Sequence, residues 1–197
     1  MDLIARAQAI LLKPKEEWVK IKGESTPIAQ LFTSYAVFLA AIPAIARFIG
    51  NGLVGRRIPF VGWARFPIGS ALFEAILYYV FTLVIIYVFG IVINALAPSF
   101  GSKQSMENAM KLAVYSMTPM LIGGIFYIFP GLAFLAWVAS LYGLYLLYLG
   151  FDNPLMDTPK DKVVGYLLVS IVVIIVLSMV VFLILGAIFT VGTIRGI

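Results

Sequence analysis

Long uncharged apolar stretches alternate with short charged segments along the chain. The segments 25–46, 112–151 and 163–194 carry no charged side chain. A helix rises about 1.5 Å per residue, so about 20 apolar residues cross a hydrocarbon layer of about 30 Å. The pattern therefore predicts membrane-spanning helices.

The apolar stretches divide into five predicted spans. The segment 112–151 is about twice as long as one crossing needs, and a Phe-Pro-Gly sequence at its midpoint, 129–131, predicts a tight turn between two helices. We therefore predict an all-α, polytopic bundle of five transmembrane helices, forming one membrane domain over 25–197. The predicted spans are about residues 25–49, 68–97, 111–129, 131–151 and 163–194.

The segment 1–24 has a different pattern, in which apolar residues recur at helical spacing between charged ones. Pro14 divides the segment, and Glu16 and Glu17 suit the first turn of a second helix. We predict an N-terminal amphipathic interfacial helix pair over 1–24, lying along the cytoplasmic membrane surface with Trp18 at headgroup level.

Composition agrees with a membrane protein. Hydrophobic residues make up 62% of the chain and charged residues only 12%, against roughly 25% in soluble domains. A net charge of +5 in so apolar a chain suits anionic lipid headgroups, and we expect no nucleic-acid partner. No cleavable secretory signal is recognisable at the N-terminus.

Lysine and arginine positions predict the orientation. With the N-terminus in the cytoplasm, nine basic residues lie on the cytoplasmic side and five on the opposite side. We expect an integral, multi-pass membrane protein with its N-terminus in the cytoplasm and its C-terminus outside. The nine are Arg6, Lys13, Lys15, Lys20, Lys22, Lys103, Lys111, Lys160 and Lys162, and the five are Arg47, Arg56, Arg57, Arg65 and Arg195.

The residue types exclude most catalytic sites. The chain has no histidine and no cysteine, so the usual activating base, thiol chemistry and zinc-ligand motifs are all missing. Asp152 and Glu74 lie near opposite membrane faces, whereas an aspartyl protease needs two acids in one site. We predict no enzyme activity, no metal and no cofactor, and Asp152 is not expected to be catalytic.

Polar residues inside the second and third spans leave two interpretations open. Glu74 is the one ionisable side chain well inside a span; such an acid can serve an ion pathway, or it can pair with a nearby arginine for structural reasons. In the third span a proline either kinks and packs the helix or helps to line a polar cavity. The residues of this second group are Tyr115, Ser116, Thr118 and Pro119.

Two further sets of residues are candidates for contacts. Small residues four apart in the fourth span predict close helix packing and include Ala136, Ala139, Ser140 and Gly143. The connection after that span mixes turn formers with charges. It is either a simple turn, or part of a cytoplasmic contact surface for a protein partner or anionic lipid, formed by Trp18, Met156, Lys160 and Lys162.

Several segments together resemble the bacterial branch of the Yip (Ypt-interacting protein) family. These are ILLKPKEEW at 10–18, YSMTP at 115–119, the proline-centred hairpin, and LYGLYLLYLG at 141–150 followed by LM and PKDK before the last span. The resemblance covers nearly the whole chain and implies the same five-span layout with the N-terminus inside, in the bacterial cytoplasmic (inner) membrane. Tyr115 and Pro119 match the family's Tyr-x-x-x-Pro feature.

In eukaryotic members the resemblance implies contacts with Rab-type GTPases and a role in vesicle formation. The Asp-Leu-Tyr-Gly-Pro motif of those members is absent here, and their long cytoplasmic N-terminal region is reduced to the short segment before the first span. Rab binding is therefore not carried over. We predict a non-catalytic scaffold or adaptor that self-associates and contacts partners or lipids at its cytoplasmic face. The alternative is a small channel or transporter built on Glu74 and the Pro119 kink.

Overall fold

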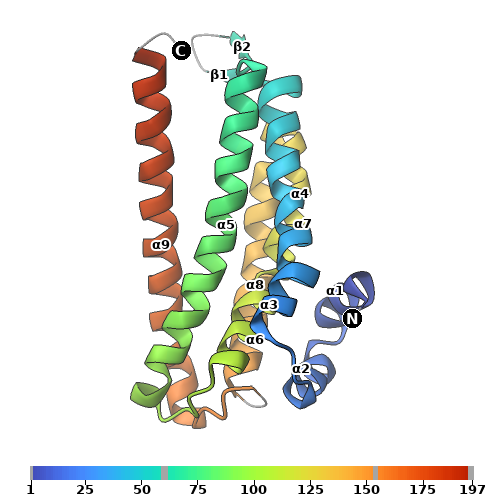
Figure 1. Ribbon diagram of the computed structural model, residues 1–197, viewed down its shortest axis with the longest axis vertical. Coiled ribbons are helices and arrows are strands. Elements are labelled where there is room, and N and C mark those ends of the chain that lie inside the picture. Colours follow the sequence, from blue (N-terminus) through green and yellow to red (C-terminus); the bar gives the residue numbers. More distant parts are fainter. Residues whose placement is uncertain (1, 59–61, 153–154, 195–197) are drawn as a thin grey trace.

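Five long helical segments run side by side in the computed structural model, which describes residues 2–58, 62–152 and 155–194 (Figure 1). Each is long and apolar enough to cross a membrane, and two short helices pack beside one end of the bundle. The predicted all-α, five-span fold is confirmed.

The first four spans are each assembled from consecutive helical pieces. The elements in chain order are α1 (Leu3–Leu12), α2 (Pro14–Gly23), α3 (Ile28–Leu31), a π-helical stretch (Phe32–Ala36), α4 (Val37–Phe48), a second π-helical stretch (Ile49–Val54), β1 (Arg56–Ile58), β2 (Gly62–Ala64), α5 (Ile68–Leu96), a 3-10 turn (Ala97–Phe100), α6 (Met106–Ser116), α7 (Thr118–Gly123), 3-10 turns (Gly124–Ile128 and Pro130–Leu132), α8 (Ala133–Asp152) and α9 (Lys160–Ile194).

Local capping defines the N-terminal helix pair. The Asp2 carboxylate accepts hydrogen bonds from the backbone N–H groups of Ile4 and Ala5 and so caps α1. Pro14 occupies the first position of α2, where its missing N–H costs nothing. Acidic residues lie in the first turn of α2 and lysines in its last, as the helix dipole favours.

The first span extends further than predicted. It remains helical to Val54, and Gly55, whose φ of 85° favours glycine, then leads into an antiparallel pairing of β1 with β2. The sequence predicts only a loop here, because such short strands cannot show a clear alternation of polar and apolar residues. We call this end of the molecule the hairpin end, and the opposite end, where α2 lies, the N-terminal end (Figure 1).

The third span is the centre of the bundle. In its most apolar window 72% of residues are buried, against 17–39% in the other four spans. It is broken at Met117: α6 ends at Ser116, and Pro119 lies in the first turn of α7, where proline is tolerated. The proline thus begins a new helix at this break.

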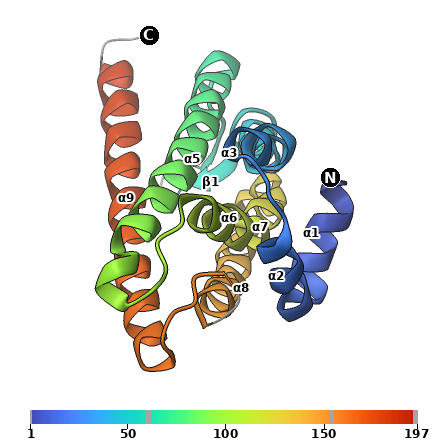
Figure 2. The same cartoon turned by 60° about the horizontal axis from the view of Figure 1, so that its bottom comes forward.

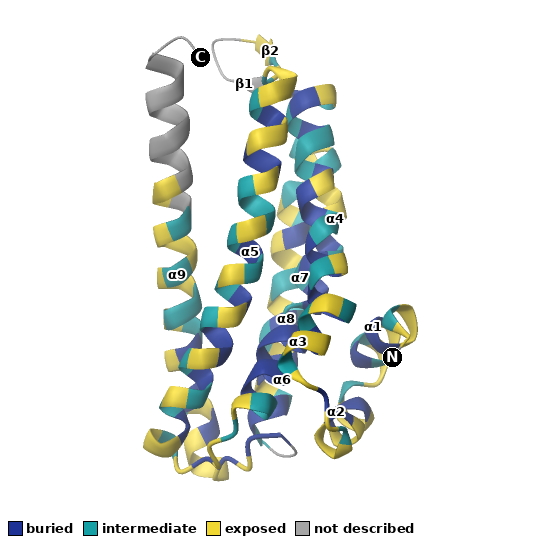
Figure 3. Ribbon diagram, in the orientation of Figure 1, coloured by how far each residue is buried: buried dark blue, intermediate teal, exposed yellow. Residues whose placement is uncertain are grey.

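The buried core is concentrated toward the N-terminal end (Figure 3). Its largest fully buried aromatic side chains come from several different elements and include Trp18, Tyr35, Phe89, Tyr115, Phe151 and Tyr166. The outward faces of α5, α8 and α9 carry exposed apolar residues, as membrane-facing helices do.

Candidate functional site

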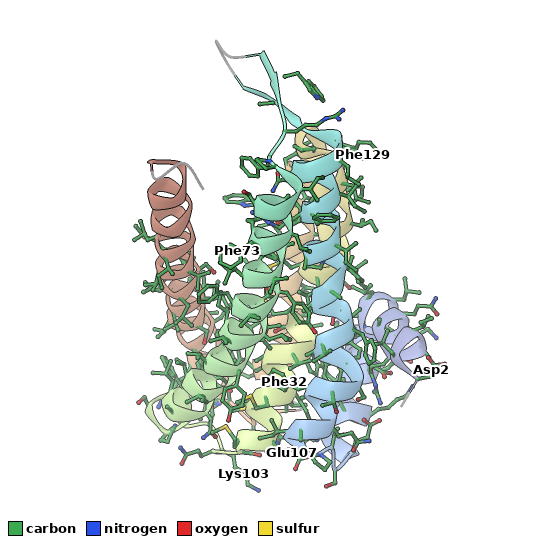
Figure 4. All side chains as sticks on the ribbon, turned by 45° about the horizontal axis from the view of Figure 1, so that its top comes forward. Asp2, Phe32, Phe73, Lys103, Glu107 and Phe129 are labelled. Atoms are coloured by element: carbon green, nitrogen blue, oxygen red, sulfur yellow. The ribbon has the colours of Figure 1, made fainter. Side chains whose placement is uncertain are left out.

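The N-terminal end gathers α1, α2, and the connections at 101–105 and 155–159 on one surface (Figure 2). Lys103 and Glu107 lie at this end, opposite Phe129 at the other (Figure 4). The candidate contact residues predicted from the sequence also belong to this end.

A buried ion-pair cluster joins α1 to α2. The Arg6 guanidinium donates hydrogen bonds to the carboxylates of Glu17 and Glu24, and its central carbon lies 5.9 Å from the centre of the Tyr115 ring. Burial lowers the pKa of Arg6, but the hydrogen bond and negative charge of Glu24 outweigh it, so the pKa is raised overall. The cation stays charged, and the cluster is a permanent electrostatic link.

A second buried cation links α2 to the third span. Lys111, 1% exposed, donates hydrogen bonds to the backbone carbonyls of Ile21 (3.3 Å) and Glu24, and its Nζ lies 2.7 Å from the Glu107 carboxylate. These carbonyls belong to the last turn of α2 and the residue after it, where a helix leaves acceptors unpaired and favours a cation. Glu107 also accepts from the Thr26 N–H at 2.9 Å.

Further contacts hold the same end together. The Tyr142 hydroxyl of α8 donates to the Leu11 carbonyl at 2.7 Å, and Lys22 pairs with Asp157 at 2.6 Å. The N-terminal helices are therefore connected to α8 and to the connection that precedes α9.

Two predicted contact residues are not on the surface. Trp18 and Met156 are both fully buried, so the predictions of a headgroup-level tryptophan and an exposed methionine are wrong. Trp18 packs against the bundle, and its ring and that of Tyr115 meet in a T-shaped arrangement with their centres 6.3 Å apart. A hydrophobic side chain at a helix face covered by protein cannot also meet lipid.

Lys160 and Lys162, by contrast, are exposed at the start of α9. Hydrogen bonds to two backbone carbonyls hold the preceding connection. The Asn108 side chain donates to the Leu155 carbonyl at 3.0 Å, and the Lys103 N–H donates to the Met156 carbonyl at 3.1 Å. The connection that precedes these two lysines is therefore fixed to the rest of the protein. Asp152 is the last residue of α8, as the turn chemistry of the sequence predicts.

The polar residues of the third span are hydrogen-bonded or packed inside the bundle. The hydroxyls of Tyr35 and Thr118 lie 2.8 Å apart, and Ser116 donates to the Leu112 carbonyl of its own helix at 2.6 Å. Tyr115 packs edge-on to Tyr35, with ring centres 5.0 Å apart, and Pro119 is buried. The residues are brought together around the break in this span.

Glu74 is buried near the hairpin end and is held by two partners. One carboxylate oxygen accepts from Arg47 Nε at 2.8 Å and from the same guanidinium's terminal nitrogen, and the other accepts from Asn51 at 3.3 Å. Arg47 also lies over the Tyr78 ring, 4.5 Å from its centre. Of the two interpretations, the arrangement matches the structural ion pair.

The small residues of α8 pack against the broken third span. A Cβ placed on Gly143 would lie 2.7 Å from the Ser116 carbonyl oxygen, and one on Gly123 would lie 2.5 Å from the Ala139 Cβ. Ala136 is buried at the same contact. Ser140 instead bonds to the Trp137 carbonyl of its own helix. Glycine is required where the two backbones approach so closely.

Sequence reasoning missed the ion-pair cluster and the buried Lys111. One signal was present: Arg6 lies four residues before Ile10, which places a charge on the same helical face as a core residue. Lys111, however, marks only the charged border of an apolar stretch. Across the described ranges, no group of three or more His, Cys, Asp or Glu side chains is placed to hold a metal ion.

Comparison with known proteins adds family information. A family model described as "Yip1 domain" matches residues 9–192. The chain is similar to "Inner membrane protein YohC" of Escherichia coli strain K12, with 29% identity over 147 residues, covering 71% of this chain and 73% of the relative. The same values apply to the protein of that name from E. coli O6:H1. No solved structure matches.

Proposed function

The chain belongs to the Yip1 domain family, and from this we propose that it is a non-catalytic scaffold or adaptor of the bacterial inner membrane, contacting protein partners or anionic lipids through its N-terminal end. In this proposal that end faces the cytoplasm, in agreement with nine basic residues on that side against five on the other. The relative named as an inner membrane protein supports the location.

The observation that carries the proposal is the clamp that fixes α1 and α2 to the bundle. The buried Arg6 joins α1 to α2, and the buried Lys111 joins the end of α2 to the third span. Burying a charge is costly unless it is paired, so such a clamp indicates a preformed end surface. The remaining lysines of this end are exposed on that surface: Lys13, Lys15, Lys20, Lys22, Lys103, Lys160 and Lys162.

The alternative of a channel or transporter receives less support from the polar residues inside the spans. The Glu74 carboxylate belongs to a residue that is 5% exposed, and it already accepts bonds from Arg47 and Asn51. A passing cation would have to displace a guanidinium from it, which is unfavourable at low dielectric. Thr118 is likewise bonded to Tyr35.

The test of the contact surface replaces Lys160 and Lys162 with glutamate. Both lie in the first turn of α9, where a negative charge favours the helix, so the fold is expected to survive. Each basic residue contributes about 1 kcal/mol at an anionic surface, so reversing both should sharply weaken crosslinking to partners in native membranes and retention of anionic lipid.

The matched control is the Lys160→Arg, Lys162→Arg variant, which keeps both charges and should behave as the wild type. Wild-type crosslinks and lipid retention in the double glutamate variant would mean that this connection is only a turn. We also propose that the protein self-associates, which is measured by light scattering of the purified protein in nanodiscs. A monomer there would refute that part alone.

A further inference from the structure

A membrane-embedded groove lies between α9 and the rest of the bundle, apart from the N-terminal end. Its volume is about 490 Å³, within the range of roughly 300–1,000 Å³ typical of small-ligand sites. It is lined by residues of α5, α7, α8 and α9, including Phe81, Met120, Trp137 and Met179. On α5 the lining runs from Tyr78 to Ile86, about 12 Å along the helix.

The groove opens toward the bilayer. Trp137 and Met179 at its border are 78% and 61% exposed, and both lie within membrane-spanning helices. A segment exposed at that depth meets lipid chains rather than water. Methionine side chains are flexible and adapt to irregular apolar shapes. The lining is thus suited to a flexible hydrocarbon chain.

One end of the groove adjoins an arginine-rich part of the chain. Arg47 in the lining is paired with Glu74, and the neighbouring connection between the first two spans adds Arg56, Arg57 and Arg65 without an acidic residue. Glu74 is the only acidic residue between positions 25 and 106, so the hairpin end carries a net positive charge, and its basic residues are arginines without a lysine. Arginine's planar guanidinium is well suited to phosphate.

We propose that this groove binds an anionic phospholipid, with an acyl chain between α5 and α9 and the phosphate at the arginine-rich hairpin end. The occupant is a lipid, because the groove faces the bilayer along α5 and α9 and its hairpin end adjoins an excess of positive charge. Charge complementarity selects the anionic headgroup.

The experiment places the full-length protein in phosphatidylcholine nanodiscs with a phosphatidylglycerol probe that carries a photoreactive diazirine on one acyl chain. Peptides labelled at Met120, which is only partly exposed inside the groove, are counted by mass spectrometry. We expect labelling about fivefold above that of a matched phosphatidylcholine probe, the ratio expected from one charge contact near the membrane surface.

Ser178→Trp fills the groove from α9 and should abolish Met120 labelling, whereas Val176→Trp, on the same helix but outside the lining, should leave it unchanged. Ile174→Trp fills the same groove one turn away and replaces Ser178→Trp if that variant elutes as an aggregate. Equal labelling by both probes, or unchanged labelling in both filled variants, would overturn the proposal. Crosslinks between two copies through the groove would overturn it in favour of self-association.

Discussion

The two buried cations show how single residues control this structure. Arg6 and Lys111 occupy buried positions at which a hydrophobic residue would carry a smaller desolvation cost. The charge of each is balanced by carboxylates or by helix carbonyls at a C-terminus. Removing either charge takes a bond away from a buried acceptor, the Glu17 carboxylate in one case and the Ile21 carbonyl in the other, and this penalty exceeds the net value of the interaction itself.

Lys111→Met is therefore expected to destabilise the docking of α2 by about 1–3 kcal/mol, the usual cost of leaving a buried acceptor without its partner, since Glu107 is itself 41% exposed. Limited proteolysis should then cut the 13–27 region faster than in the wild type. Lys103→Met is the control, since Lys103 is exposed and its side chain should contribute within about 0.5 kcal/mol. Equal cleavage in both variants would show that the Lys111 contacts do not hold α2.

At the scale of elements, the N-terminal helices have two different apolar faces. Ile10, Trp18 and Ile21 are fully buried against the bundle, while Ile4 and Val19 are exposed by 64% and 62%. The first set fixes the pair to the protein, and we propose that the second meets the membrane interface.

Trp18→Asp should release the pair from the bundle, because it removes a large buried side chain, at a cost of about 3 kcal/mol or more, and adds a buried charge. Hydrogen exchange of residues 3–23 should become fast. Val19→Asp introduces the same charge one residue further along, at an exposed position, and should leave exchange slow. Slow exchange in both variants would contradict protein-mediated docking.

The close contact between α7 and α8 depends on a glycine, which has no side chain, at position 123. Gly123→Val places a Cβ against Ala139, and overpacking of this kind costs about 1–3 kcal/mol. We expect a lower thermal midpoint in detergent. Gly69→Val makes the same change at another helical glycine, with no atom within 4 Å of the new Cβ, and should lower the midpoint much less. A larger loss at Gly69 would refute the packing role of Gly123.

At the scale of the whole molecule, charge is divided between the two ends. Arginine-rich sequence lies at the hairpin end and all the lysines at the N-terminal end, so the two membrane faces offer different chemistry. The proposed roles follow this division, with partner or lipid-surface contacts at one end and a single bound lipid near the other.

Reporter fusions test the orientation on which this division depends. Fusions at Lys22, Lys103 and Lys160 should report the cytoplasm, and fusions at Arg57, Pro130 and the C-terminus the opposite side, as the nine-to-five bias in basic residues predicts. A reversed pattern would invert the proposed contact face, while a C-terminus on the same side as Lys22 would be incompatible with five spans.

The sequence by itself determined the number of spans and the helical N-terminal pair. Both depend on local properties: the length of an apolar stretch against the membrane thickness, and turn residues such as Pro14 and Pro130. The end of α8 at Asp152 follows in the same way from the proline two residues later.

Only the tertiary structure decided what covers each face and which charges meet. The helical pattern marks Trp18 as apolar but does not say whether lipid or protein covers it, and protein does. The partners of Lys111 at Ile21 and Glu24 are 90 and 87 residues away in sequence, so no local pattern predicts their contact. Burial and ion pairing depend on neighbours brought together by folding, which the order of residues along one helix does not specify.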